Sequence, residues 1–198
     1  MSVDAAPPGP LSVVTWPVRT ERLVIRPAVP GDAARSFQIR TQPAVAEWIT
    51  SRPLDEVAFT EKVNEPAVLA TTLIVELDGV VVGDLMVRVE DAWAQAEVKE
   101  AAAGVQAELG WVLDPSVSGR GLATEAAAAL LAICFGPMGL RRVTALCFAA
   151  NTASWRVMEK LGMRREQHLV QDSLHRAGVW HDTFGYALLA TEWAELRR

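Results

Sequence analysis

The chain has 198 residues, of which 51% are hydrophobic and 22% are charged, and this composition is typical of one globular domain rather than a disordered chain. Its formal net charge of −5 gives no basic surface of the kind that nucleic acid or anionic lipid prefers. No apolar run approaches the roughly 20 residues that span a bilayer. We therefore expect neither a nucleic-acid partner nor membrane association.

The N-terminal residues contain three prolines and a glycine among small side chains, which predicts a flexible arm over 1–15 ahead of a domain over 16–198. This beginning lacks the basic and apolar regions of a signal peptide. The two cysteines, Cys134 and Cys147, have no metal-like spacing and are expected to be small buried residues. Together these features predict a cytoplasmic protein.

The first half of the chain predicts one strand, several helices and a hairpin. Asp32 is the expected N-cap of a helix that begins near Gly31. Asp78-Gly79 separates two β-branched runs, and this dipeptide predicts a tight two-residue hairpin turn. The elements expected here are a strand at 23–27, helices at 31–40, 43–49 and 51–64, and hairpin strands at 72–77 and 80–89.

The second half alternates strands with helices. The segment 90–105 is rich in Ala and Glu and fits either a short helix or a loop. Asn151 and Gly162 delimit one helix, the asparagine as its N-cap and the glycine as its end. The elements expected here are strands at 107–113, 142–148, 164–170 and 183–190, and helices at 121–135 and 151–161. This order predicts a single mixed α/β domain.

A glycine-rich segment, Ser118-Gly119-Arg120-Gly121-Leu122-Ala123-Thr124, joins a predicted strand to a predicted helix. Its two glycines allow a turn in which successive N–H groups face one point, and the helix start adds about half a positive charge. The segment has neither the Gly-Lys-Ser/Thr of a P-loop nor the third glycine of a dinucleotide fingerprint. Taken alone, it fits an anion site and an ordinary glycine turn equally well.

Four segments stand in an order that is typical of one protein family. They are Thr20–Pro27, Ala107–Pro115, the glycine-rich segment with Glu125-Ala126, and Asn151–Met163. This succession resembles the GNAT superfamily of N-acetyltransferases, in particular its RimJ/RimL-like branch, and covers roughly residues 20–189. The resemblance implies a GNAT-like α/β fold, a single domain with a mixed, mostly antiparallel sheet flanked by helices.

The resemblance also implies acetyl-CoA as a co-substrate. His168, His175 and His181 have no metal-like partners in the sequence, so no metal site is expected. In the family, backbone N–H groups of the glycine-rich loop hold the pyrophosphate. The corresponding residues here are Ser118, Gly119, Arg120, Gly121, Leu122, Ala123 and Thr124. The amides of Val112 and Leu113 would follow the pantetheine arm, with Asn151 near the coenzyme. The family pattern begins with Arg or Gln, so Ser118 departs from it.

Two residues are candidates for proton transfer. The family often places a carboxylate where Glu108 stands, so Glu108 is the candidate base, although an ion pair with Arg141 or Arg142 is an alternative role. The widespread tyrosine acid is replaced by Met158, which cannot donate a proton. The RimJ/RimL-like branch instead uses the serine of Asn-x-x-Ser, which makes Ser154 the candidate acid. Helix capping is an equally good role for this serine.

The implied reaction is transfer of an acetyl group from acetyl-CoA to a primary amine, on a protein N-terminus or on a small molecule. A non-catalytic acyl-CoA sensor is the alternative, because the tyrosine acid is absent. Transfer of another acyl group, such as succinyl, is a third. The segment 90–106 is long for its position, which suggests a part in the acceptor pocket or in a homodimer contact.

Overall fold

The computed structural model describes residues 9–197. They form two compact units, one from the chain up to Val87 together with Trp111–Ile133, the other from Arg88–Gly110 together with the chain from Cys134 onward. Residues 1–8 of the expected arm lie outside the described residues. Within the rest of it, Pro10–Val13 forms a 3-10 helix and Leu11 is only 1% exposed, so this part is packed rather than loose.

The first unit contains an antiparallel arrangement in the order β1-β2-β3-β4. The strands are β1 (Val18–Arg19), β2 (Leu23–Pro27), β3 (Thr72–Leu77) and β4 (Val80–Glu90). Asp78 and Gly79 between β3 and β4 have φ angles of 52° and 77°, which confirms the tight hairpin turn. The two-residue strand β1 was not expected, because so short a run carries no alternation pattern.

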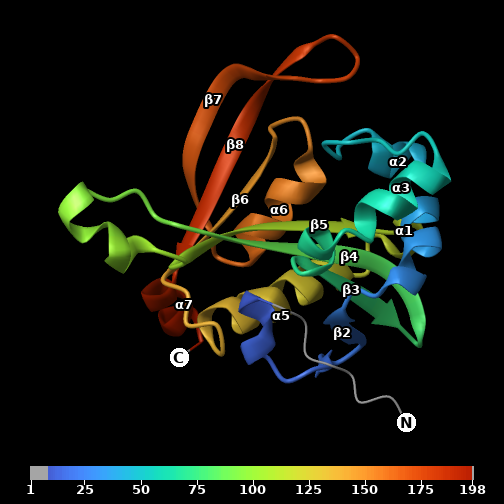
Figure 1. The fold of residues 1–198 in the computed structure, drawn as a ribbon. Coiled ribbons are helices and arrows are strands. Elements are labelled where there is room, and N and C mark those ends of the chain that lie inside the picture. The colour runs from blue at the N-terminus through green and yellow to red at the C-terminus, as the bar shows by residue number, and fades with distance from the viewer. Residues whose placement is uncertain (1–8, 198) are drawn as a thin grey trace. The chain divides into compact units, whose positions relative to one another are not determined.

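Helices of the first unit are η2 (Pro30–Asp32), α1 (Ala33–Arg40), α2 (Pro43–Ala46), α3 (Glu56–Val63), α4 (Pro66–Leu69), η4 (Pro115–Val117) and most of α5 (Leu122–Phe135). Phe37 of α1 packs on Phe59 of α3 with ring centroids 5.7 Å apart, and the two helices lie side by side in Figure 1. Asp32 precedes α1 but does not cap it. Its carboxylate instead accepts two hydrogen bonds of 2.8 Å from Arg26 and one of 2.8 Å from the Val29 N–H, so both of its oxygens already have donors.

The second unit contains strands in the order β5-β6-β8-β7. They are β5 (Gln106–Leu113), β6 (Arg142–Phe148), β7 (Arg164–Leu174) and β8 (Trp180–Leu189). β5 runs parallel to β6, whereas β8 is antiparallel to both β6 and β7. β7 and β8 form a long hairpin (Figure 1), and both extend beyond the predicted limits. Nearly all of β7 is exposed, so cross-strand hydrogen bonds rather than buried side chains set its length.

Helical elements of the second unit are η3 (Ala96–Ala102), α6 (Thr152–Lys160) and α7 (Ala190–Leu196). The predicted caps of α6 are confirmed. The Asn151 side chain accepts the N–H of Ser154, and Gly162 has a φ of 76°. The strand expected at 183–190 ends at Leu189. There Glu192 accepts the Leu189 N–H at 2.9 Å and starts α7.

The predicted α/β class, with a mixed, mostly antiparallel sheet and flanking helices, is confirmed. The longest helix, α5, has 14 residues and buries Ala126, Ala127 and Leu130 completely, as expected for a helix enclosed by the core. Within residues 9–197, no helix has both the length and the apolar character that crossing a bilayer requires.

Candidate active site

The glycine-rich loop has the backbone geometry of an anion site. Residues 118–121 are exposed, and Gly119 and Gly121 have φ angles of 75° and 77°, in the left-handed region that favours glycine. Glu125 N donates to Gly121 O at 3.1 Å, the first bond of helix α5. The amides of Leu122, Ala123 and Thr124 therefore precede the intrahelical ladder and have no acceptor within it. These amides and the helix start suit a phosphate oxygen.

Ser118 differs from the other loop residues. Its N–H already donates to Pro115 O at 3.0 Å, within the turn η4. A backbone donor occupied in this way is not offered to a phosphate. Among the expected binding residues 118–124, Ser118 is therefore the one whose N–H is already hydrogen-bonded within the protein. Its hydroxyl is the group that could still bind a phosphate.

Val112 and Leu113 end strand β5, where both are half-buried. A side chain at Gly83 of β4 would place its Cβ 2.2 Å from Val112 O, so only glycine permits this approach of the two backbones. Asp114 N then donates to Val82 O at 2.8 Å. Gly83 could not be identified from the sequence, because a glycine inside a strand does not reveal which neighbouring backbone it accommodates.

Asn151 and Ser154 come together at the start of α6. Asn151 Oδ1 accepts the Ser154 N–H at 3.2 Å, so the cap uses the backbone of Ser154 and leaves its hydroxyl available. That hydroxyl lies near the thiol of Cys147 on β6. Burial raises the pKa of Cys147 to about 11, and the neighbouring Ser154 hydroxyl only partly opposes this, so the thiol is protonated at neutral pH. Met158 is 1% exposed and belongs to the core.

Glu108 lies on β5 and forms an ion pair with Arg88 of β4. The expected alternatives were Arg141 and Arg142, and the structure gives a different partner. Arg142 pairs with Glu166 instead. The Glu108 side chain is 24% exposed, so solvent reaches the carboxylate.

The expected site residues divide between the two units. Residues 118–124, Val112 and Leu113 belong to the first unit, and Glu108, Asn151 and Ser154 belong to the second. Within the second unit Asn151 and Ser154 are in contact, whereas Glu108 is engaged by Arg88. Their roles with a coenzyme stay predictions.

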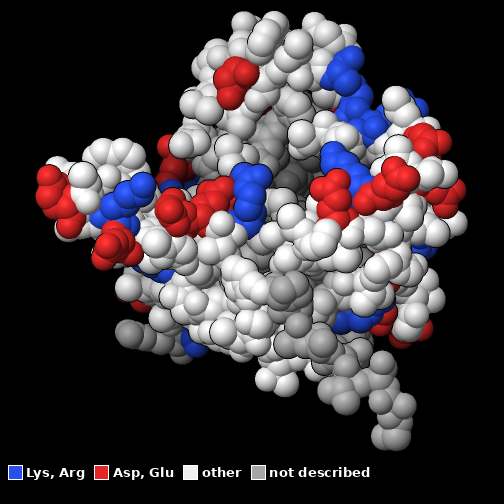
Figure 2. Space-filling view, viewed as in Figure 1, with Lys and Arg blue, Asp and Glu red and all other residues white. Residues whose placement is uncertain are grey.

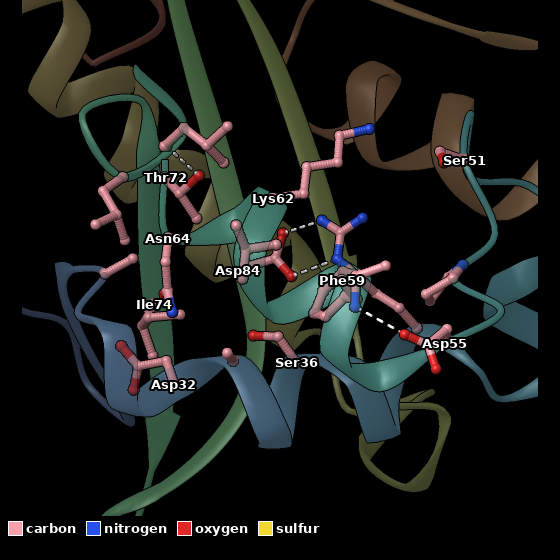
Figure 3. A pocket seen from close by; sticks show the side chains of 18 of the residues that line it. Asp32, Ser36, Ser51, Asp55, Phe59, Lys62, Asn64, Thr72, Ile74 and Asp84 are labelled. Carbon is pink, nitrogen blue, oxygen red and sulfur yellow. Dashed lines mark hydrogen bonds and ion pairs between the residues drawn. The ribbon is translucent and has the colours of Figure 1, made fainter. Parts of the chain in front are cut away.

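A cavity of about 450 Å³ lies in the first unit between α1, α3, α4 and strands β3 and β4 (Figure 3). Ile74, Ala33 and Phe59 give it an apolar wall. Its buried carboxylate Asp84 is neutralised by Arg40, at 2.5 Å. Asp55 caps α3 by accepting the Ala58 N–H at 2.8 Å.

Three other polar residues of the cavity, Arg52, Lys62 and Asn64, are available to a ligand. In the part of the chain that the structure describes, Arg52 and Lys62 line the cavity and form no ion pair. The Asn64 Oδ1 atom is buried without a hydrogen-bond donor. Buried acceptors normally have donors. The cavity therefore suits a ligand that carries both a donor and a negative charge, beside apolar atoms.

Charged residues of both signs are mixed on the face of the molecule that Figure 2 draws, without a broad basic surface. Among residues 9–197, no three His, Cys, Asp or Glu side chains are grouped as metal ligands would be.

Comparison with known proteins gives a consistent result. A family model described as acetyltransferase (GNAT) domain matches residues 22–164. The crystal structure of a GNAT-family acetyltransferase from Bacillus anthracis is 31% identical, covers 88% of this chain and 99% of that one, and has a TM-score of 0.73. RimJ of Mycobacterium smegmatis, in complex with CoA-disulfide, has the same fold, with 24% identity, coverage of 89% and 90%, and a TM-score of 0.68.

Among curated proteins, the N-acetyltransferase YnaD of Bacillus subtilis (strain 168) is 42% identical over 86 residues, which are 43% of this chain and 50% of YnaD. The chain thus spans about half the length of the curated relatives it matches. The family match and the Bacillus anthracis structure cover most of the chain, and together with the loop geometry they establish that it belongs to the GNAT acetyltransferase family.

Proposed function

We propose that this protein transfers an acetyl group from acetyl-CoA to a primary amine. The observation that carries the proposal is the exposed loop 118–121 at the start of α5, with its two left-handed glycines and the unpaired amides that follow. Those donors fit the pyrophosphate of coenzyme A. When bound, acetyl-CoA supplies a thioester whose acetyl group the amine attacks.

The residues of the second unit supply the proton transfers in this proposal. An alkyl ammonium has a pKa of about 10 and must lose a proton before it attacks. Glu108 accepts this proton, directly or through a water. The Ser154 hydroxyl donates a proton to the departing thiolate and takes the place of the tyrosine that Met158 replaces. General acid–base assistance of this kind contributes about 10²–10⁴-fold.

The cavity of the first unit is our candidate for the acceptor site. Asp32 and Asp84 are neutralised by Arg26 and Arg40, whereas Arg52 and Lys62 favour an acceptor with an anionic group. Asn64 Oδ1 would accept from an amine or amide N–H. Amino acids combine these features, and so do protein N-termini that carry an acidic side chain close to the amine.

Release of free thiol from acetyl-CoA tests the proposal. The purified protein should release thiol only when an acceptor is added, and faster with amino acids or short peptides than with spermidine. Succinyl-CoA serves as the second donor, to test for a different acyl group. Tight binding of acetyl-CoA without thiol release for any acceptor would identify a sensor instead.

A further inference from the structure

Glu125, in the first turn of α5, binds the segment that precedes β2. Its side chain is 16% exposed. Oε1 accepts hydrogen bonds from Thr20 Oγ1 at 2.5 Å and from Arg22 N at 2.9 Å, and Oε2 accepts from Arg22 Nε at 2.7 Å. Three donors that lie about a hundred residues away in sequence therefore fix the start of this helix.

The same arginine also holds the glycine-rich loop itself. Arg22 Nη1 donates to Arg120 O at 2.9 Å, a backbone carbonyl between the two left-handed glycines. Arg22 Nη2 lies 2.6 Å from Glu125 Oε2. The Arg22 guanidinium therefore joins the start of α5 to the loop backbone. It holds the Arg120 carbonyl, directly before Gly121 and the free amides of residues 122–124.

The charge of Glu125 needs this partner. Burial alone would raise the pKa of Glu125, but hydrogen bonds from Thr20 and Arg22 bring that pKa below its ordinary value. The carboxylate is therefore negative at neutral pH, in the turn that would face a pyrophosphate. An unpaired carboxylate there would repel the phosphate, whereas Arg22 cancels its charge.

We propose that Arg22 and Glu125 are a positioning pair that holds the loop 118–121 in its anion-binding conformation and removes the repulsion between Glu125 and the bound anion. This inference rests on the proposed function, which assigns the pyrophosphate to the loop. Neither residue is one of the proton-transfer residues Glu108 and Ser154, so we expect the pair to act on coenzyme affinity rather than on turnover.

Calorimetric titration with coenzyme A tests the pair. Arg22→Ala should weaken binding at least tenfold, because it frees the loop and leaves Glu125 uncompensated. The double variant Arg22→Ala/Glu125→Gln should bind better than Arg22→Ala, because the residual charge is gone. With acetyl-CoA and an acceptor, KM should rise in Arg22→Ala while kcat stays within about twofold.

Arg26→Ala is the matched control. Arg26 pairs with two carboxylates, Asp32 and Glu76, within the same unit, but donates nothing to the loop. The Arg26→Ala variant should have a lower melting temperature, and its affinity for coenzyme A should stay within twofold of that of the unchanged protein. If Arg26→Ala weakened coenzyme binding as much as Arg22→Ala, loss of general stability would explain both, and the proposal would be wrong.

Hydrogen exchange of the ligand-free protein separates this proposal from the proposed function. The hydrogen-bonded amides at the two ends of the loop, Ser118 N and Glu125 N, should exchange faster in Arg22→Ala than in the unchanged protein or in Arg26→Ala. Equal exchange, or faster exchange with unchanged affinity, would overturn the positioning role. If the unchanged protein does not bind coenzyme A at all, the proposed function fails, and the exchange rates still decide whether the pair orders the loop.

Discussion

Arg88 and Glu108 form an ion pair that joins the end of β4 to β5 within the second unit. Arg88 also donates to Glu90 at 2.9 Å. The Glu90 hydrogen bond first, and then the negative charge of Glu108, raise the pKa of Arg88, so the guanidinium keeps its proton. The candidate base, Glu108, therefore lies beside a guanidinium that stays positively charged.

The candidate base predicts the pH dependence of the reaction. Glu108→Gln should lower kcat by about 10²–10⁴-fold and flatten the acidic limb of the pH–rate profile, because the proton acceptor is gone. Initial rates from pH 5 to 9 measure both effects. An unchanged profile in Glu108→Gln would remove Glu108 from the mechanism.

Ser154→Ala should lower kcat while coenzyme affinity stays within about twofold. The cap of α6 survives this change, since Asn151 accepts the backbone N–H of residue 154 rather than its hydroxyl. Thermal unfolding should therefore be nearly unchanged. Asn151→Ala is the contrast, with an expected stability loss of about 1 kcal/mol. If Ser154→Ala lost affinity and kept its turnover, Ser154 would be a binding residue.

Gly119→Ala should show whether the backbone conformation of the loop is needed for coenzyme binding, apart from any effect on stability. Gly119 has a φ of 75°, and a Cβ there meets nothing within 4 Å, so the cost is backbone strain alone, about 1–2 kcal/mol. Gly79 in the β3–β4 turn matches it, with a φ of 77° and equal space. Both alanine variants should melt a few degrees lower. Only Gly119→Ala should lose coenzyme affinity, by tenfold or more in a calorimetric titration.

Glu166 should make stability depend on pH. A hydrogen bond from Arg142 is the main cause that lowers the pKa of Glu166 from 4.5 to about 2. Because the pKa of Glu166 is lower in the folded protein, its interaction with Arg142 stabilises the fold fully above pH 4.5. This stabilisation is lost as the pH falls toward 2.

Glu166→Gln should therefore cost about 1 kcal/mol at pH 7, after allowance for solvent screening of this partly exposed group. The variant and the unchanged protein should converge near pH 2. Urea unfolding at pH 7, 4 and 2 measures this difference. Glu97→Gln, on the exposed turn η3, is a control that should keep the pH dependence of the unchanged protein. A constant gap between Glu166→Gln and the unchanged protein would contradict the assignment.

Local features were the ones that the sequence predicted well. The Asp78-Gly79 turn and the Asn151 and Gly162 caps depend on residues a few positions apart, and the structure confirms them. The limits of β7 and the helix α7 were missed. In both cases hydrogen bonds with other segments, rather than side-chain alternation, set where the element begins and ends.

The family, the order of the elements and the glycine-rich loop could all be predicted from the residues, because motifs, glycine positions and helix starts are local properties. The partners of the charged groups could not, and they are known from the folded chain alone. Arg22 meets Glu125 and Arg88 meets Glu108 because separate strands and helices bring them together. A charge has no preferred partner in sequence, and the fold alone fixes which opposite charge lies within hydrogen-bonding distance.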